Sequence, residues 1–230
     1  MAIGEKYIAL TSWLQRTYKD SALLSFEELS QIIDIPKYAY NNRSAWANSK
    51  KPSSLAASWL NAGYVVAGAS ICDRWVLFKK GTSEDCASSN VVELEDGRIT
   101  KYNGDGGEIA IPNGARSISF GAFENDIFTA VVIPRSIEEI TPLAFSGLHK
   151  LERVIVSEGV TTIGVGAFRG CTALNRVTLP RTLTFISWLA FEGCTSLTEI
   201  HYRGTDKEWE QITKSDGWGE GERKIKIICK

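Results

Sequence analysis

The most regular feature of the chain is a hydrophobic pattern that returns every 23 residues, with one unit of 22, through its second half. Three columns of this pattern are Ile118, Ile140, Ile163 and Ile186; Ala122-Phe123, Ala144-Phe145, Ala167-Phe168 and Ala190-Phe191; and Leu151, Leu174 and Leu197. One such unit is too short to bury its apolar edge, whereas stacked units bury it as continuous ladders. The pattern therefore predicts a repeat solenoid over residues 108–212.

Each unit is expected to hold one short strand and a tight turn. Residues 151–156 (LERVIV) alternate as a strand with one apolar edge does. A proline then ends the strand and a glycine permits the turn, at Pro112, Pro134, Pro180, Gly147, Gly170 and Gly193. Cys171 and Cys194 are one repeat apart, and we interpret them as small buried apolar side chains rather than a disulfide.

The best-preserved unit, residues 177–197, reads VTLPRTLTFISWLAFEGCTSL. It resembles the BspA-like subclass of leucine-rich repeats, and residues 200–212 (IHYRGTDKEWEQI) resemble that family's closing unit. The resemblance implies a leucine-rich-repeat solenoid that binds rather than catalyses. It also leaves open a role in cell-surface adhesion, which is common where this repeat class occurs.

Both ends of such an array expose core and need a cap. Val91 to Thr100 predicts an opening hairpin around Asp96-Gly97, within a linker and cap segment at 81–107. At the far end, Thr205 and Glu208 predict a capping box that begins a short helix, with Trp209 covering the last repeat. Residues 213–230 are assigned to a closing cap or tail.

Residues 1–80 lack the 23-residue period and are expected to form a separate small domain. Helices are predicted from about Ile8, from the Ser25 to Glu28 capping box up to Pro36, and from about Ser53 to Ala62; strands are predicted at 64–71 and 75–79. Three helices followed by a hairpin is the order of a winged helix-turn-helix, although many small domains share it. The expected fold class is thus α+β, a winged-helix-like domain followed by a short solenoid.

Three segments of this first domain resemble an uncharacterised bacterial domain family. Its patterns L-T-F-x-E-I, W-W-x-N and A-W-L-x-A-G-W correspond to residues 24–29 (LSFEEL), 45–48 (AWAN) and 58–64 (SWLNAGY). Ala45 and Tyr64 depart from the pattern, each standing where the family has Trp. Similar domains are attached to nuclease or restriction-type proteins, so the resemblance points toward nucleic acid, and the loss of a paired tryptophan puts that link in doubt.

An excess of Lys and Arg in residues 1–80 is consistent with nucleic-acid binding but does not by itself indicate it. Residues 1–80 hold ten Lys/Arg against six Asp/Glu, whereas the whole chain has a net charge of -1. A candidate nucleic-acid site groups cations for phosphates with an aromatic ring and an amide, and consists of Arg43, Trp46, Asn48, Lys50 and Lys51. In the competing interpretation, Trp46 is core and the lysines belong to a solvated loop.

The catalytic inventory is small. Only His149 and His201 titrate near neutral pH, and neither lies beside a cysteine, a serine elbow or a carboxylate pair in the sequence. Phosphate-binding and dinucleotide motifs are missing, so we expect no enzyme and no cofactor. The five cysteines form no C-x-x-C pair, and residues 103–108 (NGDGGE) are interpreted as a glycine-rich turn rather than a metal site.

The outward face of the repeat strands is the main candidate site. If the apolar positions point inward, a surface of aliphatic residues and paired arginines points outward. Its members are Val132, Glu152, Arg153, Ile155, Asn175, Arg176, Thr178, Glu199 and His201. We expect a protein partner there, although β-branched residues also suit strands for their own sake. No stretch is apolar enough to span a membrane, and the expected location is cytoplasmic.

Overall fold

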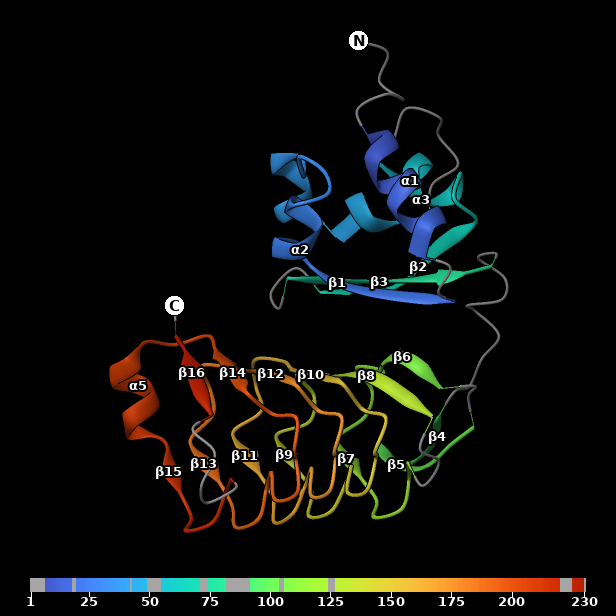
Figure 1. The fold of residues 1–230 in the computed structure, drawn as a ribbon. Coiled ribbons are helices and arrows are strands. Elements are labelled where there is room, and N and C mark those ends of the chain that lie inside the picture. Colours follow the sequence, from blue (N-terminus) through green and yellow to red (C-terminus); the bar gives the residue numbers. More distant parts are fainter. Residues whose placement is uncertain are drawn as a thin grey trace. The chain divides into compact units, whose positions relative to one another are not determined.

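A computed structural model describes residues 7–17, 20–41, 43–48, 55–70, 74–81, 92–103, 106–123, 127–219 and 225–229. It divides the chain into two units, Met1–Ser89 and Asn90–Lys230, which we call the amino-terminal unit and the repeat unit (Figure 1). The amino-terminal unit joins short helices to an antiparallel sheet, and the repeat unit is a coil of short parallel strands.

The amino-terminal unit contains three described α-helices, two 3-10 turns and a three-stranded sheet. In chain order these are α1 (Ile8–Thr17), β1 (Ser21–Ser25), α2 (Phe26–Ser30), η2 (Lys37–Tyr40), η3 (Arg43–Trp46), α3 (Ala56–Leu60), β2 (Tyr64–Ser70) and β3 (Trp75–Lys80). The sheet has the order β1-β3-β2, and both pairings are antiparallel. A bulge between Val66 and Gly68 interrupts the register of β2, which lies at the sheet edge.

Aromatic rings form the centre of this unit's core. The Trp46 ring lies 5.1 Å from that of Phe26 and 6.1 Å from that of Trp59, which in turn lies 5.6 Å from Phe78. Leu10 and Leu14 of α1 are fully buried in the same cluster. A small domain with few residues gains much of its buried apolar area from such large side chains.

The predicted winged-helix fold is not confirmed, because the helices after α1 are only five residues long and a strand, β1, precedes α2. The capping box is confirmed: the Glu28 amide donates to Ser25 Oγ at 3.1 Å, and the Ser25 amide donates to Glu28 Oε2 at 2.8 Å. The predicted helix nevertheless ends at Ser30, well before Pro36. Pro36 itself disfavours a helical conformation only at the residue directly ahead of it. The apolar run before Ser25 forms the strand β1, which was not predicted.

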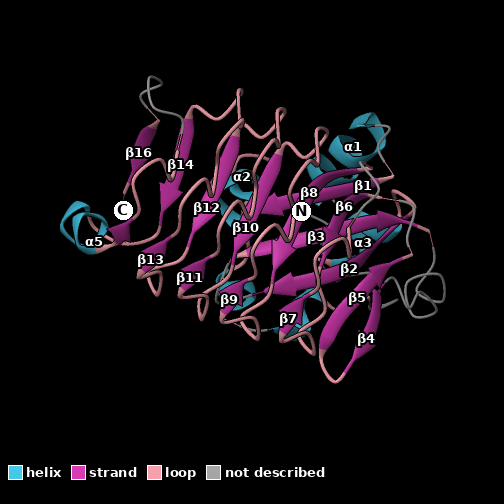
Figure 2. Cartoon of the chain, turned by 90° about the horizontal axis from the view of Figure 1, so that it is seen from below, coloured by secondary structure: helices cyan, strands magenta, loops and turns pink. Residues whose placement is uncertain are grey.

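The repeat unit is built from two parallel sheets and an opening hairpin. Its elements are β4 (Val92–Glu95), β5 (Arg98–Tyr102), β6 (Gly107–Ala110), β7 (Ser117–Ile118), β8 (Phe128–Ile133), β9 (Glu139–Ile140), β10 (Arg153–Val156), β11 (Thr162–Ile163), β12 (Arg176–Leu179), β13 (Phe185–Ile186), β14 (Glu199–Tyr202), α5 (Asp206–Gln211), β15 (Thr213–Lys214) and β16 (Lys226–Ile228). Six strands form the sheet β16-β14-β12-β10-β8-β6, and four shorter ones form β15-β13-β11-β9 (Figure 2). The predicted solenoid is therefore confirmed.

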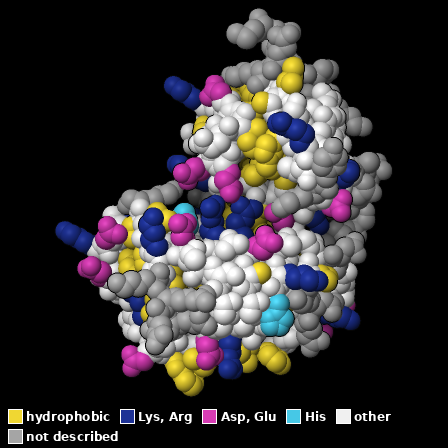
Figure 3. All heavy atoms as spheres, in the orientation of Figure 1, with side chains coloured by type: hydrophobic (Ala, Val, Ile, Leu, Met, Phe, Trp, Pro, Cys, Tyr) yellow, Lys and Arg dark blue, Asp and Glu magenta, His cyan; other side chains and the backbone are white. Residues whose placement is uncertain are grey.

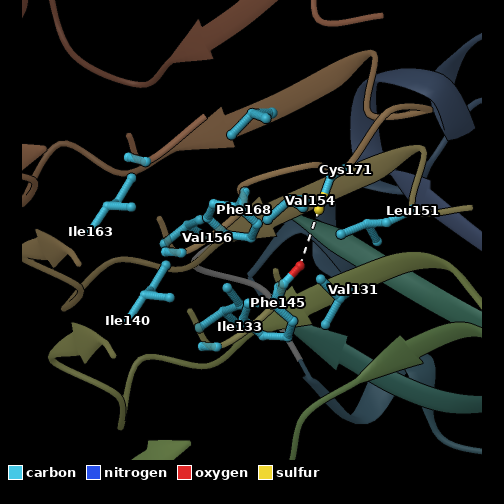
Figure 4. Close-up of a cluster of buried hydrophobic side chains, with 14 of the residues drawn as sticks. Val131, Ile133, Ile140, Phe145, Leu151, Val154, Val156, Ile163, Phe168 and Cys171 are labelled. Atoms are coloured by element: carbon cyan, nitrogen blue, oxygen red, sulfur yellow. Dashed lines mark hydrogen bonds between the residues drawn. The ribbon is translucent and has the colours of Figure 1, made fainter. Parts of the chain in front are cut away.

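The repeating columns of the sequence become ladders inside the coil (Figure 4). The rings of Phe145, Phe168 and Phe191 stack at centroid distances of 5.4 Å, with interplanar angles of 3° and 9°. Cys171 and Cys194 are buried free thiols that donate to the carbonyl oxygens of Phe145 and Phe168, each at 3.1 Å. This confirms that they are small core side chains and not a disulfide.

Both predicted caps are present. The opening hairpin β4–β5 turns at Asp96 and Gly97, whose φ values are 50° and 80°, while Val91 lies outside the described residues. The closing helix α5 has the predicted capping box between Thr205 and Glu208, and the Trp209 ring lies 5.4 Å from that of Tyr202. Beyond it, β15 and β16 extend the two sheets, so this segment continues the solenoid rather than forming a simple tail.

Candidate protein-binding face

The six-stranded sheet of the repeat unit has one face in the solenoid core and one that points away from it. Along β8 and β10, Val131, Ile133, Val154 and Val156 belong to the core cluster. Successive side chains of a strand alternate between faces, so the residues between them point outward. We call the outward surface of β6, β8, β10, β12, β14 and β16 the strand face.

A charged row crosses the strand face from one end to the other. Parallel register places its members side by side, in the order Glu108, Ala130, Arg153, Arg176, Glu199 and Lys226. Arg176 is exposed, Arg153 is half-buried, and Arg153 Nη2 lies 3.7 Å from Glu108 Oε1. The centre of the row therefore presents two neighbouring guanidinium groups between carboxylates.

Sequence reasoning identified Arg153, Arg176 and Glu199 in this row but missed Glu108 and Lys226. The period fails only at the last coil, where Lys226 pairs with Glu199 across 27 residues, whereas Glu108 pairs with Ala130 across the 22 residues of the shorter unit. The sequence signal for the last coil is the strand-like segment 225–229 (IKIIC), which lies just outside the periodic region.

A second row, next to the charged one, is less polar. It runs through Ala110, Val132, Ile155, Thr178, His201 and Ile228. Val132 and Ile155 were expected to be exposed, but their exposed fractions are 1% and 5%. The accessible part of this row begins at Thr178, and the exposed residues beside it are Glu152, Asn175 and Arg176.

His201 is the histidine of the strand face and its candidate for acid-base chemistry. Its Nε2 lies 3.3 Å from Glu199 Oε2, two residues earlier on β14 and therefore on the same face. This geometry allows a hydrogen bond between the imidazole and the carboxylate.

Trp46 of the candidate nucleic-acid site is a core residue. Its exposed fraction is 2%, its Nε1 donates to the Ala39 carbonyl oxygen at 3.0 Å, and its ring packs beside those of Phe26 and Trp59. No face of the ring is therefore presented for stacking on a base. The described part of the chain supports the core interpretation of this residue.

Asn48 also has a structural position. Its Oδ1 accepts from Trp59 Nε1 at 3.1 Å and from the Val66 amide at 2.8 Å, and its Nδ2 donates to the Val66 carbonyl oxygen at 3.0 Å. The side chain thus satisfies one residue of the edge strand β2, which otherwise offers open hydrogen-bonding groups. Asn48 lines an open hollow of about 460 Å³ together with Trp46, Ala47 and residues 66–69.

Arg43 lies in η3, and Lys50 and Lys51 lie outside the described residues. In the described ranges, no three His, Cys, Asp or Glu side chains gather in a group that could hold a metal ion. Within the same ranges, no helix has the length and apolar character needed to cross a membrane.

Coiled parallel strands with Ile, Leu and Phe ladders define the class of leucine-rich-repeat solenoids. Residues 102–213 match the family described as BspA type Leucine rich repeat region, in six copies. Residues 7–81 match a family described as Domain of unknown function (DUF7662), in agreement with the predicted likeness to an uncharacterised domain. No curated protein matches the chain.

Solved structures with similar folds come from bacterial leucine-rich-repeat proteins. A leucine rich cell surface protein from Faecalibacterium prausnitzii is 30% identical, over 52% of this chain and 31% of its own, with a TM-score of 0.45. A leucine-rich repeat protein from Eubacterium ventriosum is 20% identical, over 48% and 30%, with a TM-score of 0.43. The leucine rich repeat protein of T. pallidum is 26% identical, over 57% and 56%, with a TM-score of 0.36. The chain thus spans about a third of the length of the first two.

Proposed function

We propose that the repeat unit is a recognition module that binds an acidic surface of another protein through its strand face. The family supports protein binding or surface adhesion as a class of function, and its members are generally non-enzymatic. The specific proposal rests on one observation, the pair Arg153 and Arg176 in register at the centre of the face.

Two cations in register on neighbouring strands repel each other, and Glu108, which lies 3.7 Å from Arg153, offsets part of this repulsion. Parallel strands lie about 4.8 Å apart, and like charges directly opposite one another destabilise a sheet. The core ladders beneath this row need no arginine, because Val154 and Val177 face inward at the adjoining positions. A partner that brings carboxylates to the two guanidinium groups converts this cost into affinity through bidentate hydrogen bonds.

The exposed neighbours of the pair give the surface its polar character. Glu152 and Asn175 lie just before β10 and β12 and are exposed, as Arg176 is. Strands β10 and β12 hold Arg153 and Arg176, and Glu152 and Asn175 directly precede these strands, so the face needs little reordering to bind. A nucleic-acid function has no comparable support in the described residues, because Trp46 is buried and Asn48 is hydrogen-bonded to Trp59 and Val66.

The test is partner capture with a charge-reversed face. The intact protein and the double variant Arg153→Glu/Arg176→Glu are used as bait in lysate of the native host. A matched control, Arg135→Glu/Lys207→Glu, makes the same change in net charge at two exposed residues outside the strand face. We expect a partner that the wild type and the control retain and the face variant loses, with similar melting temperatures for all three. Equal retention by all three would refute the strand face as the binding site.

A further inference from the structure

The imidazole of His201 is a titratable group in the accessible part of the strand face. His201 lies on β14, in register with Thr178 of β12 on one side and with Ile228 of β16 on the other. Its side chain is 34% exposed, so it can exchange protons with solvent and contact a bound partner. An imidazole in this position allows the charge of the face to change with pH.

Charged side chains surround this imidazole on three strands. On its own strand, Glu199 Oε2 lies 3.3 Å from His201 Nε2. Glu199 in turn stands in register between Arg176 of β12 and Lys226 of β16. Two residues beyond His201, the Arg203 side chain reaches β10, where its Nη1 donates to a backbone carbonyl oxygen at 3.3 Å. Figure 3 shows acidic and basic side chains along the upper border of the repeat unit, with a histidine among them.

The chemistry of these side chains makes the imidazole the group to consider near neutral pH. Imidazole changes its charge between about pH 5 and 8, whereas carboxyl, amino and guanidinium groups ordinarily titrate outside this range. Burial, and then a hydrogen bond with Asp206, raise the pKa of the Cys229 thiol just after β16 to about 11, so this thiol stays neutral there. His149 lies in a turn outside the strand face.

We propose that His201 makes binding at the strand face pH-dependent, so that the face holds its acidic partner more tightly as the pH falls from about 8 to about 5. This inference rests on the proposed function, because it requires that the face binds carboxylates through Arg153 and Arg176. It adds a regulation of that site, in which one proton changes the strength of the contact.

Protonation of His201 strengthens binding in two ways. The charged row holds three cations and two carboxylates, a net charge of +1, and an imidazolium beside it adds one more positive charge. The imidazolium also pairs with Glu199, the carboxylate that stands next to Arg176 and competes there with a carboxylate of the partner. Both effects are present below the titration range of the imidazole and are lost as the pH rises through it.

The expected change in the dissociation constant is about fivefold. Strand spacing and register place the Cα atom of His201 about 8 Å from that of Arg176. A unit charge about 8 Å from a partner carboxylate changes the constant about 30-fold at the effective dielectric constant of a protein surface, and screening at about 0.1 M salt reduces this to about fivefold. At about 1 M salt the pH dependence should disappear.

Affinity measurements on the full chain at about pH 5.5 and about pH 8 test the inference. The probe is an acetylated hexapeptide in which aspartate and alanine alternate, because aspartate ordinarily stays ionised at both values. We expect the wild type to bind about fivefold more tightly at the lower pH, and His201→Gln to bind equally at both. His149→Gln, at an exposed residue outside the strand face, should keep the wild-type difference.

A fixed charge provides a second variant. His201→Lys stays positively charged throughout, so it should bind at both pH values about as tightly as the wild type does at the lower one. Circular dichroism at both pH values checks that each variant is folded. A pH dependence that persists in His201→Gln, or tighter binding by the wild type at the higher pH, overturns the inference.

The outcomes also separate this inference from the proposed function. Probe binding that Arg153→Glu/Arg176→Glu abolishes, but that is equal at both pH values in the wild type, overturns the pH dependence and leaves the strand face as the binding site. Absence of binding by the wild type at either pH contradicts both the pH dependence and the recognition of acidic surfaces.

Discussion

The stacked phenylalanines at the centre of the solenoid give the sharpest stability prediction. Phe168 is fully buried, and its ring lies 5.4 Å from both Phe145 and Phe191, nearly parallel to each. Phe168→Ala removes the ring and leaves a cavity, which costs about 3–5 kcal/mol in well-packed cores. Two aromatic contacts worth about 0.5–1.5 kcal/mol each are lost as well, so we expect the upper part of that range.

Phe120→Ala is the matched control, because it deletes the same atoms from a ring that is 75% exposed. Its expected cost is within about 0.5 kcal/mol, as for other surface substitutions. Guanidinium unfolding of the full chain, followed by circular dichroism at low protein concentration, measures both values. The two units have separate cores, so we expect the Phe168 variant to move only one of two transitions. A loss for Phe168→Ala below about 1.5 kcal/mol, or equal to that of the control, refutes the ladder as the source of stability.

Three further predictions address other parts of the chain. Gly159→Ala should destabilise the repeat unit by more than about 2 kcal/mol, because φ is +110° and the new Cβ would lie 2.7 Å from the Arg135 carbonyl oxygen. Gly147→Ala is the control, because its φ is +79° but nothing lies near the new Cβ, and it should cost about 1 kcal/mol in the same denaturation assay. Asn48→Ala should lower the melting temperature of the amino-terminal unit, because three hydrogen bonds to Trp59 and Val66 are lost, whereas an unchanged melting temperature would show that Asn48 is dispensable for the fold. Hydrogen bonds from the Thr205 amide and the Arg181 side chain hold the pKa of Glu208 below its ordinary value of 4.5. The capping box of α5 should therefore stabilise the helix fully above pH 4.5 and lose this effect as the pH falls through the lowered pKa. Trp209 fluorescence should follow this acid dependence, and Glu208→Gln should flatten it.

The repeat unit was predictable from sequence because one physical requirement recurs many times. Every coil must place Ile, Phe and Leu in the same ladder, so the period and the inward positions follow from the alignment of the chain with itself, while local turn and capping-box residues indicate the caps. The arginine pair of the strand face follows by elimination once the inward positions are fixed. The burial of Val132 and Ile155 does not follow, because alternation determines the direction of a side chain and not what surrounds it.

The amino-terminal unit was harder to predict because its elements are short. The Ser25 capping box located the start of α2 correctly, but β1 was hidden in an apolar run that reads equally well as part of a helix. Cationic neighbours in sequence left a surface site open for Trp46 and Asn48 beside the core interpretation. Their contacts with Phe26, Trp59 and Val66 come from segments that the local sequence does not indicate.

The turns that follow the short strands carry an apolar column that the periodic alignment does not place in or out of the core. Phe120, Val165 and Trp188 share a column with Pro142, yet the column is too irregular to mark a core position. Only the exposure of the turn distinguishes it from the inward ladders.

The most direct test of the central claim, that the strand face is the binding surface, is a photo-crosslinking footprint on the captured partner. A photoreactive residue at Thr178, in the middle of the strand face, should crosslink to the partner, and one at Thr162, on the short-strand sheet, should not. Efficient crosslinking from Thr162 together with none from Thr178 would contradict the account.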